Sequence, residues 1–168
     1  MRILGIDPGS RHCGFGLVVA ERGRTRYLAS GRITLPTAVH LSERLSRLHD
    51  GLAEMITRHA PDSAAVEKVF FAKNVKSALS LGQARGVVLA ALASAGIPVQ
   101  EYSALEIKKA VVGYGRADKA QIQNMVVALL GLRSRPSEDE ADALAVALCH
   151  THASALNSRL QAALARHG

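Results

Sequence analysis

Four acidic residues in this sequence stand where a carboxylate is costly unless it has a partner. Asp7 and Glu67 each end a short apolar segment of the kind that forms a buried strand. An ionised carboxylate resists burial without a counter-charge. Asp139 and Asp142 lie three residues apart, so their side chains share one face of a helix, roughly 5–6 Å apart at Cβ. The chemistry at these positions depends on whether the four carboxylates converge.

A convergence of the four carboxylates would create a site for divalent cations. Close pairs of ionised carboxylates repel by about 1–4 kcal/mol at protein-surface dielectrics. Two cations would neutralise the four negative charges, and hard oxygen ligands favour Mg²⁺ or Mn²⁺ over Zn²⁺. A pair of such ions about 3.5–4 Å apart activates water and stabilises the leaving oxygen of a phosphodiester. The pattern therefore predicts a metal-dependent nuclease.

Simpler interpretations of these acids stay open on the sequence alone. Asp7 precedes Pro8-Gly9 and can simply start a turn. Acids in the first turn of a helix, such as Asp139, are favoured by the helix dipole without any further role. Asp142 lies beyond that turn and directly before an apolar run, which favours a role in the site.

The basic excess of the chain is concentrated in its middle. The net charge is +7, and residues 70–135 contain nine basic residues against three acidic ones, a net +6. Such an excess predicts a polyanionic partner, because phosphate contacts release counterions and dominate affinity for nucleic acids. A basic surface with no such partner would also explain the charge.

Hydrophobic periodicity predicts the elements that must position the acids. Three strands with short links favour an antiparallel meander, with Gly31 as a bulge or break in the third. A helix then alternates with two further strands, and a right-handed crossover makes those two strands parallel. The fold class is therefore α/β, a mixed five-stranded sheet flanked by helices. The expected strands are 3–6, 15–19, 26–35, 64–67 and 99–102, and the expected helices begin near Leu41, Ser77, Ser103, Asp118 and Ser137.

Length and composition narrow the class of protein. The 168 residues predict one nuclease domain, 1–168, in which 154–168 forms a basic helical tail of unread role. A content of 48% hydrophobic and 21% charged residues excludes a disordered chain. We find no secretory signal and no apolar run of roughly 18 residues, so we expect a cytoplasmic protein with no membrane partner. Cys13 and Cys149 lack metal-ligand spacing and are expected to stay reduced.

Several motifs, taken together and in order from Arg2 to about His152, resemble the RuvC family of bacterial Holliday-junction resolvases. They are Gly5-Ile6-Asp7-Pro8-Gly9-Ser10, Glu67 with Val69-Phe70, Leu81–Gly86, Val111-Val112-Gly113 and Asp139-x-x-Asp142-Ala143-Leu144-Ala145. The resemblance implies an RNase H-like fold and a homodimer that nicks two strands of a four-way DNA junction symmetrically in recombination and repair. It further implies 5′-phosphate and 3′-hydroxyl ends, two Mg²⁺ ions per site with Mn²⁺ as a substitute, and work beside the RuvA–RuvB branch-migration complex.

The resemblance also assigns roles to single residues. The catalytic and metal-binding tetrad falls on Asp7, Glu67, Asp139 and Asp142. Lys108 and Lys119 match lysines near the scissile phosphate, where they would meet its developing charge. Phe70 matches an aromatic that stacks on a base, although a core position stays an alternative for it. The residues expected to contact the DNA backbone, each of which could instead be a solvated surface charge, are Lys73, Lys76, Arg85, Lys109 and Arg116.

The apolar helix near 77–95 has two interpretations. Gly82 and Gly86 lie four residues apart and permit another helix to approach closely. By resemblance this helix borders the dimer interface, and two-fold symmetry suits a substrate with two equivalent strands. Burial within one chain is the simpler explanation.

Three other functions compete with this hypothesis. An RNase H-like ribonuclease that acts on structured RNA precursors would use the same carboxylates. An ATP-binding protein of the sugar-kinase or actin class would also place Asp-x-Gly-Ser after a strand, but the chain lacks a second lobe and a later glycine-rich phosphate turn. A non-catalytic DNA-binding scaffold would not need all four acids, and all four are present.

Overall fold

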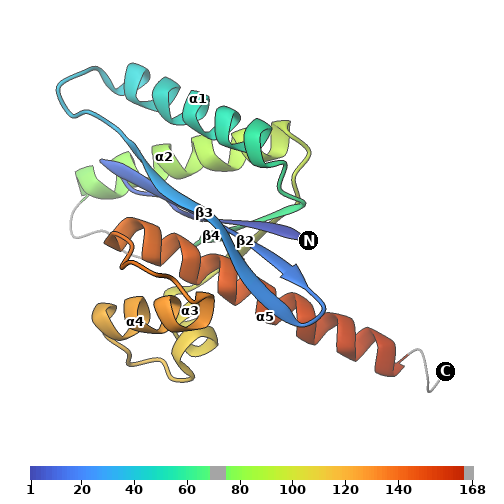
Figure 1. Ribbon diagram of the computed structural model, residues 1–168. Coiled ribbons are helices and arrows are strands. Elements are labelled where there is room, and N and C mark those ends of the chain that lie inside the picture. Colours follow the sequence, from blue (N-terminus) through green and yellow to red (C-terminus); the bar gives the residue numbers. More distant parts are fainter. Residues whose placement is uncertain (69–74, 165–168) are drawn as a thin grey trace.

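The fold is built on one five-stranded mixed sheet (Figure 1). The computed structural model describes residues 1–68 and 75–164, apart from the side chains at 157–160 and 162–163. The strand order is β3-β2-β1-β4-β5. The first three strands pair antiparallel, while β4 is parallel to both β1 and β5, so the predicted sheet is confirmed. The strands are β1 (Arg2–Asp7), β2 (His12–Glu21), β3 (Arg24–Thr34), β4 (Ser63–Glu67) and β5 (Val99–Tyr102).

Helices cover both faces of the sheet. In Figure 1, α1 and α2 lie above the sheet, and α3, α4 and α5 lie below it. The helices are α1 (Leu41–His59), α2 (Val75–Ser94), α3 (Ala104–Val112), α4 (Lys119–Leu130) and α5 (Glu138–Leu164). The C-terminal segment from residue 154 therefore continues α5 as far as Leu164. No helix in the described part of the chain is long and apolar enough to cross a membrane.

The alternation of side chains along β1 divides the core in two. Leu4 and Ile6 are fully buried against α1 and α2, whereas Ile3 is fully buried on the side of α5. Successive residues of a strand face opposite sides, so Gly5 and Asp7 share the face of Ile3. The chain thus directs the carboxylate at the end of β1 towards α5.

Helix α5 lies unusually close to the sheet because glycines line its path. A Cβ atom on Gly5 would lie 2.1 Å from the carbonyl oxygen of Ala143, and one on Gly14 would lie 2.1 Å from that of Asp139. A larger residue at either position would force the helix away. The close contact fixes the first turns of α5 over the ends of β1 and β2.

Side-chain caps set several helix boundaries where the sequence predicts them. Ser103 and Glu106 form a capping box at α3, and Ser137 and Glu140 form the same reciprocal hydrogen bonds at α5. The predicted bulge at Gly31 is wrong, because the register shift lies between Leu17 and Val18 of β2 and their partners in β3. Gly31 instead makes room for the ring of its cross-strand partner Phe15, which a Cβ atom would approach to 2.6 Å.

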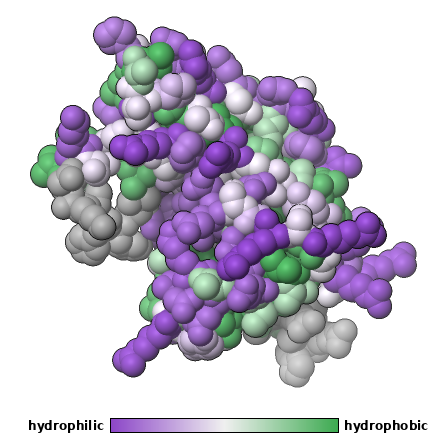
Figure 2. Space-filling model, turned by 60° about the vertical axis from the view of Figure 1, so that its left-hand side comes forward, coloured by the Kyte–Doolittle hydropathy of each residue, from purple (hydrophilic) through white to green (hydrophobic). Residues whose placement is uncertain are grey.

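Hydrophilic side chains dominate the face of the molecule drawn in Figure 2, and hydrophobic residues form small separate patches there. Most large apolar side chains lie in the two cores instead. Cys13 and Cys149 are both buried and free of disulfide bonds. The face left for partners on this side is therefore mainly polar.

Candidate active site

Asp7 and Glu67 end two neighbouring parallel strands. The register pairs Ile6 of β1 with Val66 of β4, so the next residue on each strand is an acid. Ala65 packs in the same core as Ile3, which places Glu67 on the α5 face together with Asp7. The topology alone thus brings together two carboxylates that lie 60 positions apart in the chain.

The other two acids reach this point through the first turns of α5. Gly14 is the cross-strand partner of Asp7, and the backbone of Asp139 lies directly against it. A cavity of about 370 Å³ opens beside this contact, lined by Asp7, Glu67 and Asp142 together with Lys108 and Lys119. Asp139 does not line this cavity and instead lies 3.9 Å from Arg32 on β3.

The carboxylates raise one another's pKa. Burial, followed by repulsion from Glu67, Asp142 and Asp139, raises the pKa of Asp7 to about 7, against an opposing effect of Lys119. Burial and then the charge of Asp142 raise the pKa of Glu67, and burial is also the main cause of the raised pKa of Asp142. The neighbouring positive charges therefore do not fully compensate the negative charge of these carboxylates.

Two lysines oppose this charge only in part. Lys119 Nζ lies 3.9 Å from Asp142 Oδ2 and 3.6 Å from Glu138 Oε2, and its side chain is 73% exposed. Lys108 lines the cavity from α3 and lowers the pKa of both Glu67 and Asp142. An exposed ion pair contributes little to stability. The carboxylates would therefore still gain from binding a cation out of the solvent.

The site fits a hard divalent cation by its chemistry. Its donors are carboxylate oxygens, which suit Mg²⁺ or Mn²⁺. The raised pKa of Asp7 marks a negative charge that a cation would stabilise. Within residues 1–68 and 75–164, no three His, Cys, Asp or Glu side chains are already gathered as a ligand set for a metal ion.

The residues predicted to contact DNA are scattered around this centre. Lys109 and Arg116 are exposed near the end of α3 and in the loop after it, and Lys76 lines an apolar pocket at the start of α2. Arg85 forms an ion pair with Glu101, and its side chain is only 28% exposed. These four assignments stay predictions. Phe70 and Lys73 lie outside the described residues.

Sequence reasoning missed the basic residues on the β3 side of the centre. Arg32 comes next to Asp139 only through the pairing of Gly14 with Arg32, a register that the sequence does not reveal. Arg133 and Arg135 belong to the basic stretch 70–135. Their position just before the capping box of α5 is the signal from which a place near the site could have been predicted.

Comparisons with known proteins agree with this geometry. The family model described as "Crossover junction endodeoxyribonuclease RuvC" matches residues 3–150. A protein of that name from Burkholderia mallei is 54% identical over 152 residues, which cover 90% of this chain and 84% of the relative. One from Bordetella parapertussis is 54% identical over 160 residues, or 95% and 88% of the two chains.

Solved structures give the same result. The structure described as Thermus thermophilus RuvC in complex with Holliday junction substrate superposes with a TM-score of 0.87 at 36% identity, covering 94% of this chain and 96% of that one. A yeast mitochondrial Holliday junction resolvase shares the fold, with a TM-score of 0.63 at 13% identity. With the family model, the curated relatives and the fold in agreement over most of its length, the chain belongs to the RuvC family of crossover junction endodeoxyribonucleases.

Proposed function

We propose that this protein is an endonuclease that resolves four-way DNA junctions by paired symmetric nicks during recombination and repair. The observation that carries the proposal is the cavity in which Asp7, Glu67 and Asp142 meet with raised pKa values beside two lysines. The relatives are named crossover junction endodeoxyribonucleases, and one of the matched structures holds a Holliday junction. The family's function therefore supports the interpretation of the site.

The proposed cofactor is Mg²⁺, two ions per site, with Mn²⁺ as a substitute. Asp7, Glu67, Asp139 and Asp142 would hold these cations, and the repulsion among their carboxylates supports that role. The chemistry supplied by the cations when bound is activation of the attacking water and stabilisation of the leaving oxygen.

The residues of the chain itself provide orientation and charge. Strands β1 and β4 hold Asp7 and Glu67 on a rigid sheet, so the in-line geometry is set by the most strongly packed part of the fold. Lys108 and Lys119 would face the scissile phosphate and its developing negative charge. In-line hydrolysis on this arrangement leaves the 5′-phosphate and 3′-hydroxyl ends that the family resemblance implies.

A homodimer is the proposed working form. Helix α2 buries Ala84, Val88 and Leu92 but leaves Val75 and Leu79 exposed at 77% and 63%. A Cβ atom added to Gly82 would meet no atom of the described residues within 4 Å, so this face of α2 is flat and open. Two copies packed through it would present two sites to the two equivalent strands of a junction. We further propose cytoplasmic action beside the RuvA–RuvB complex, on the strength of the family resemblance.

One cleavage assay separates this function from its rivals. A four-way junction, a linear duplex of the same sequence and a structured RNA are each incubated with the protein and Mg²⁺. We expect paired nicks in the junction, which ligase can reseal, and no cutting in EDTA. The variant Asp7→Asn should bind the junction without cutting it, whereas Asp50→Asn on exposed α1 should cut normally. Preferential cutting of the RNA would contradict the proposal and favour the ribonuclease alternative.

A further inference from the structure

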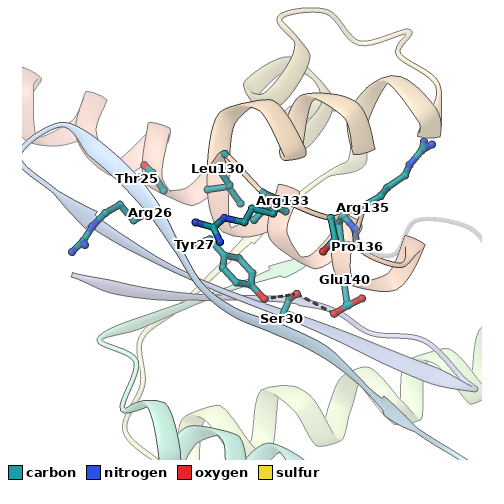
Figure 3. Close-up of a pocket in the computed structure, with 12 residues that line it drawn as sticks. Thr25, Arg26, Tyr27, Ser30, Leu130, Arg133, Arg135, Pro136 and Glu140 are labelled. Carbon is teal, nitrogen blue, oxygen red and sulfur yellow. Dashed lines mark hydrogen bonds between the residues drawn. The ribbon is translucent and has the colours of Figure 1, made fainter.

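A second cavity, distinct from the acidic one, lies between β3 and the segment that joins α4 to α5 (Figure 3). Its volume is about 630 Å³, and residues 25–30 form one wall while residues 130–136 form the other. Arg26, Arg133 and Arg135 line it together with Tyr27. In Figure 3, Arg133 extends towards Tyr27, while the guanidinium groups of Arg26 and Arg135 point outwards at the two ends. We call this feature the arginine pocket.

The single carboxylate in the arginine pocket is already engaged. Glu140 accepts hydrogen bonds from the backbone nitrogen of Ser137 at 2.9 Å and from the hydroxyl of Ser30 at 3.0 Å. The hydroxyl groups of Ser30 and Tyr27 are also hydrogen-bonded, 3.1 Å apart. Glu140 therefore caps the start of α5 and binds Ser30 in the wall of the pocket. Among the described residues it forms no ion pair with the pocket arginines.

The arginines keep most of their capacity for a ligand. Arg135 uses its Nε to bind Gln123 Oε1 at 2.7 Å, which fixes the side chain while its two terminal nitrogens stay available. Arg133 has no ion-pair partner within the described part of the chain. Arg26 lies 3.3 Å from Glu21, but both side chains are more than half exposed, so that pair contributes little. The pocket thus presents the guanidinium group of Arg133 inside and those of Arg26 and Arg135 at its ends, and of the three only Arg26 has an acidic partner among the described residues.

The arginine pocket is continuous with the acidic centre. A smaller cavity of about 220 Å³ lies between them and shares Arg135 with the arginine pocket. It shares Lys119 and Asp142 with the cavity around Asp7. A track of charged side chains therefore runs from the acids, past Lys119 and its ion-pair partner Glu138, to the arginines beside β3.

We propose that the arginine pocket binds the phosphodiester backbone of the DNA strand that flanks the scissile phosphate, an inference that rests on the proposed nuclease function. Guanidinium groups match phosphate oxygens in a bidentate geometry and keep their charge at any physiological pH. Backbone contacts of this kind fix the register of the substrate without reading its sequence. The continuous track makes DNA the ligand, because a strand whose phosphate sits among the acids must leave along one of the grooves that meet there.

Salt-dependent binding tests the proposal. Binding of a labelled junction is measured by fluorescence anisotropy in EDTA, across a series of salt concentrations, for the parent and for Arg133→Ala/Arg135→Ala. Each lost phosphate contact removes about 0.9 from the slope of log affinity against log salt, so the double variant should lose about 2 for each protomer bound to the junction. Arg47→Ala/Arg58→Ala is the matched control, because it removes two exposed charges from α1 on the opposite face of the sheet.

The same measurements show which outcome would overturn the inference. An unchanged slope in Arg133→Ala/Arg135→Ala, or an equal loss in the α1 control, contradicts it. Arg133→Ala alone guards against misfolding, since it breaks no hydrogen bond or ion pair among the described residues. It should lose about 1 from the slope for each protomer bound, with an unchanged Tm. Shortening the junction arms step by step should abolish the difference between parent and variant. If the parent cuts no junction in Mg²⁺ at all, the proposed function fails instead.

Discussion

At the scale of single residues, the acids of the site lower the stability of the folded protein. Partial burial, followed by repulsion from the neighbouring acids, raises the pKa of Asp7 to about 7 from an ordinary value of 3.8. In the unfolded chain the same carboxyl group ionises near its ordinary value. Ionisation therefore favours the unfolded state by about 4 kcal/mol once the pH exceeds both values. Such a cost is typical of residues retained for function.

In metal-free buffer the variant Asp7→Asn should therefore be more stable than the parent, by an amount that grows as the pH rises. At pH 3 and below the two proteins should have similar Tm values, because Asp7 is then mostly protonated in both states. As the pH rises from 4 to 7 only the unfolded parent ionises at this position, so the parent loses stability that the variant keeps. At pH 8 we expect the variant to melt several degrees higher, since about 1 kcal/mol corresponds to roughly 2–4 °C at this size.

Thermal denaturation in EDTA from pH 3 to 8 checks this, with Asp50→Asn as the control because Asp50 lies exposed on α1. Adding Mg²⁺ should raise the Tm of the parent far more than that of Asp7→Asn, since a cation that binds only the folded state stabilises it. A variant that melts at or below the parent at pH 8 in EDTA would contradict the burial and repulsion assigned to Asp7.

The sequence could identify acids of this site but not the arginine beside them, and the reason is physical. An acid at the end of an apolar strand conflicts with its surroundings, and that conflict is visible in the sequence for Asp7 and Glu67. An arginine on the surface is compatible with its surroundings, so nothing in the sequence distinguishes Arg32 from other basic residues. Its position depends on the pairing of β2 with β3, which long-range contacts decide.

At the scale of elements, the approach of α5 to the sheet determines where two of the four acids lie. The variant Gly14→Ala should move them, because its Cβ would lie 2.1 Å from the carbonyl oxygen of Asp139. The neighbouring backbone must shift, and overpacking of this kind costs typically about 1–3 kcal/mol. We expect a lower Tm together with cleavage at least about 10-fold slower, because an error near 1 Å in positioning costs up to about 100-fold.

Two measurements distinguish displacement of the acids from simple loss of stability. Cleavage is assayed well below the Tm of the variant, where the protein is folded, and the Mg²⁺ concentration that gives half-maximal rate is determined. Displaced acids should raise that concentration, whereas a merely less stable protein should keep the parental value. Gly51→Ala on α1 is the control, because its Cβ would approach only the Ile33 side chain, no closer than 3.1 Å, and its φ needs no glycine. Parental rate and Mg²⁺ dependence in Gly14→Ala would contradict the positioning role.

The predicted elements follow from local signals, and the errors arise where a distant partner decides. The caps at Ser103, Asp118 and Ser137 fix three helix starts through bonds that span three residues, so the sequence states them directly. The bulge between β2 and β3 depends on how two strands pair, and glycine alone predicted it at the wrong place. Gly31 serves the Phe15 ring on the neighbouring strand, a contact that no local pattern contains.

At the scale of the whole molecule, the acids lie at the ends of the inner strands β1 and β4 and at the start of α5, and one helix offers a surface for a second copy. The boundaries of a single domain over residues 1–168 stay a prediction. The cores leave an apolar patch exposed at the start of α2, where Leu41, Val75 and Leu79 line a shallow cavity of about 580 Å³. Exposed apolar surface of this kind marks an interaction site. If it joins two copies, the symmetry of cleavage originates in this patch.

The variant Leu79→Glu should separate the dimer and uncouple the two cuts. A buried carboxylate on each side of a two-fold interface is costly, and the two charges would also repel each other. Sedimentation should show a monomer where the parent is a dimer. Leu156→Glu is the control, because Leu156 is a comparably exposed leucine on α5, at 58% against 63% for Leu79, and should leave the dimer intact.

A supercoiled plasmid with an extruded cruciform distinguishes paired from single cuts. The dimer cuts both strands within the lifetime of one complex and yields linear DNA. A separated monomer cuts one strand, and the released supercoiling then absorbs the cruciform before a second cut, so the product is a nicked circle. Leu79→Glu should shift the product from linear to nicked DNA, while the acids, which lie on the opposite face of the sheet from α2, keep their function. Linear product from a proven monomer would mean that symmetry of the cuts does not depend on a symmetric protein.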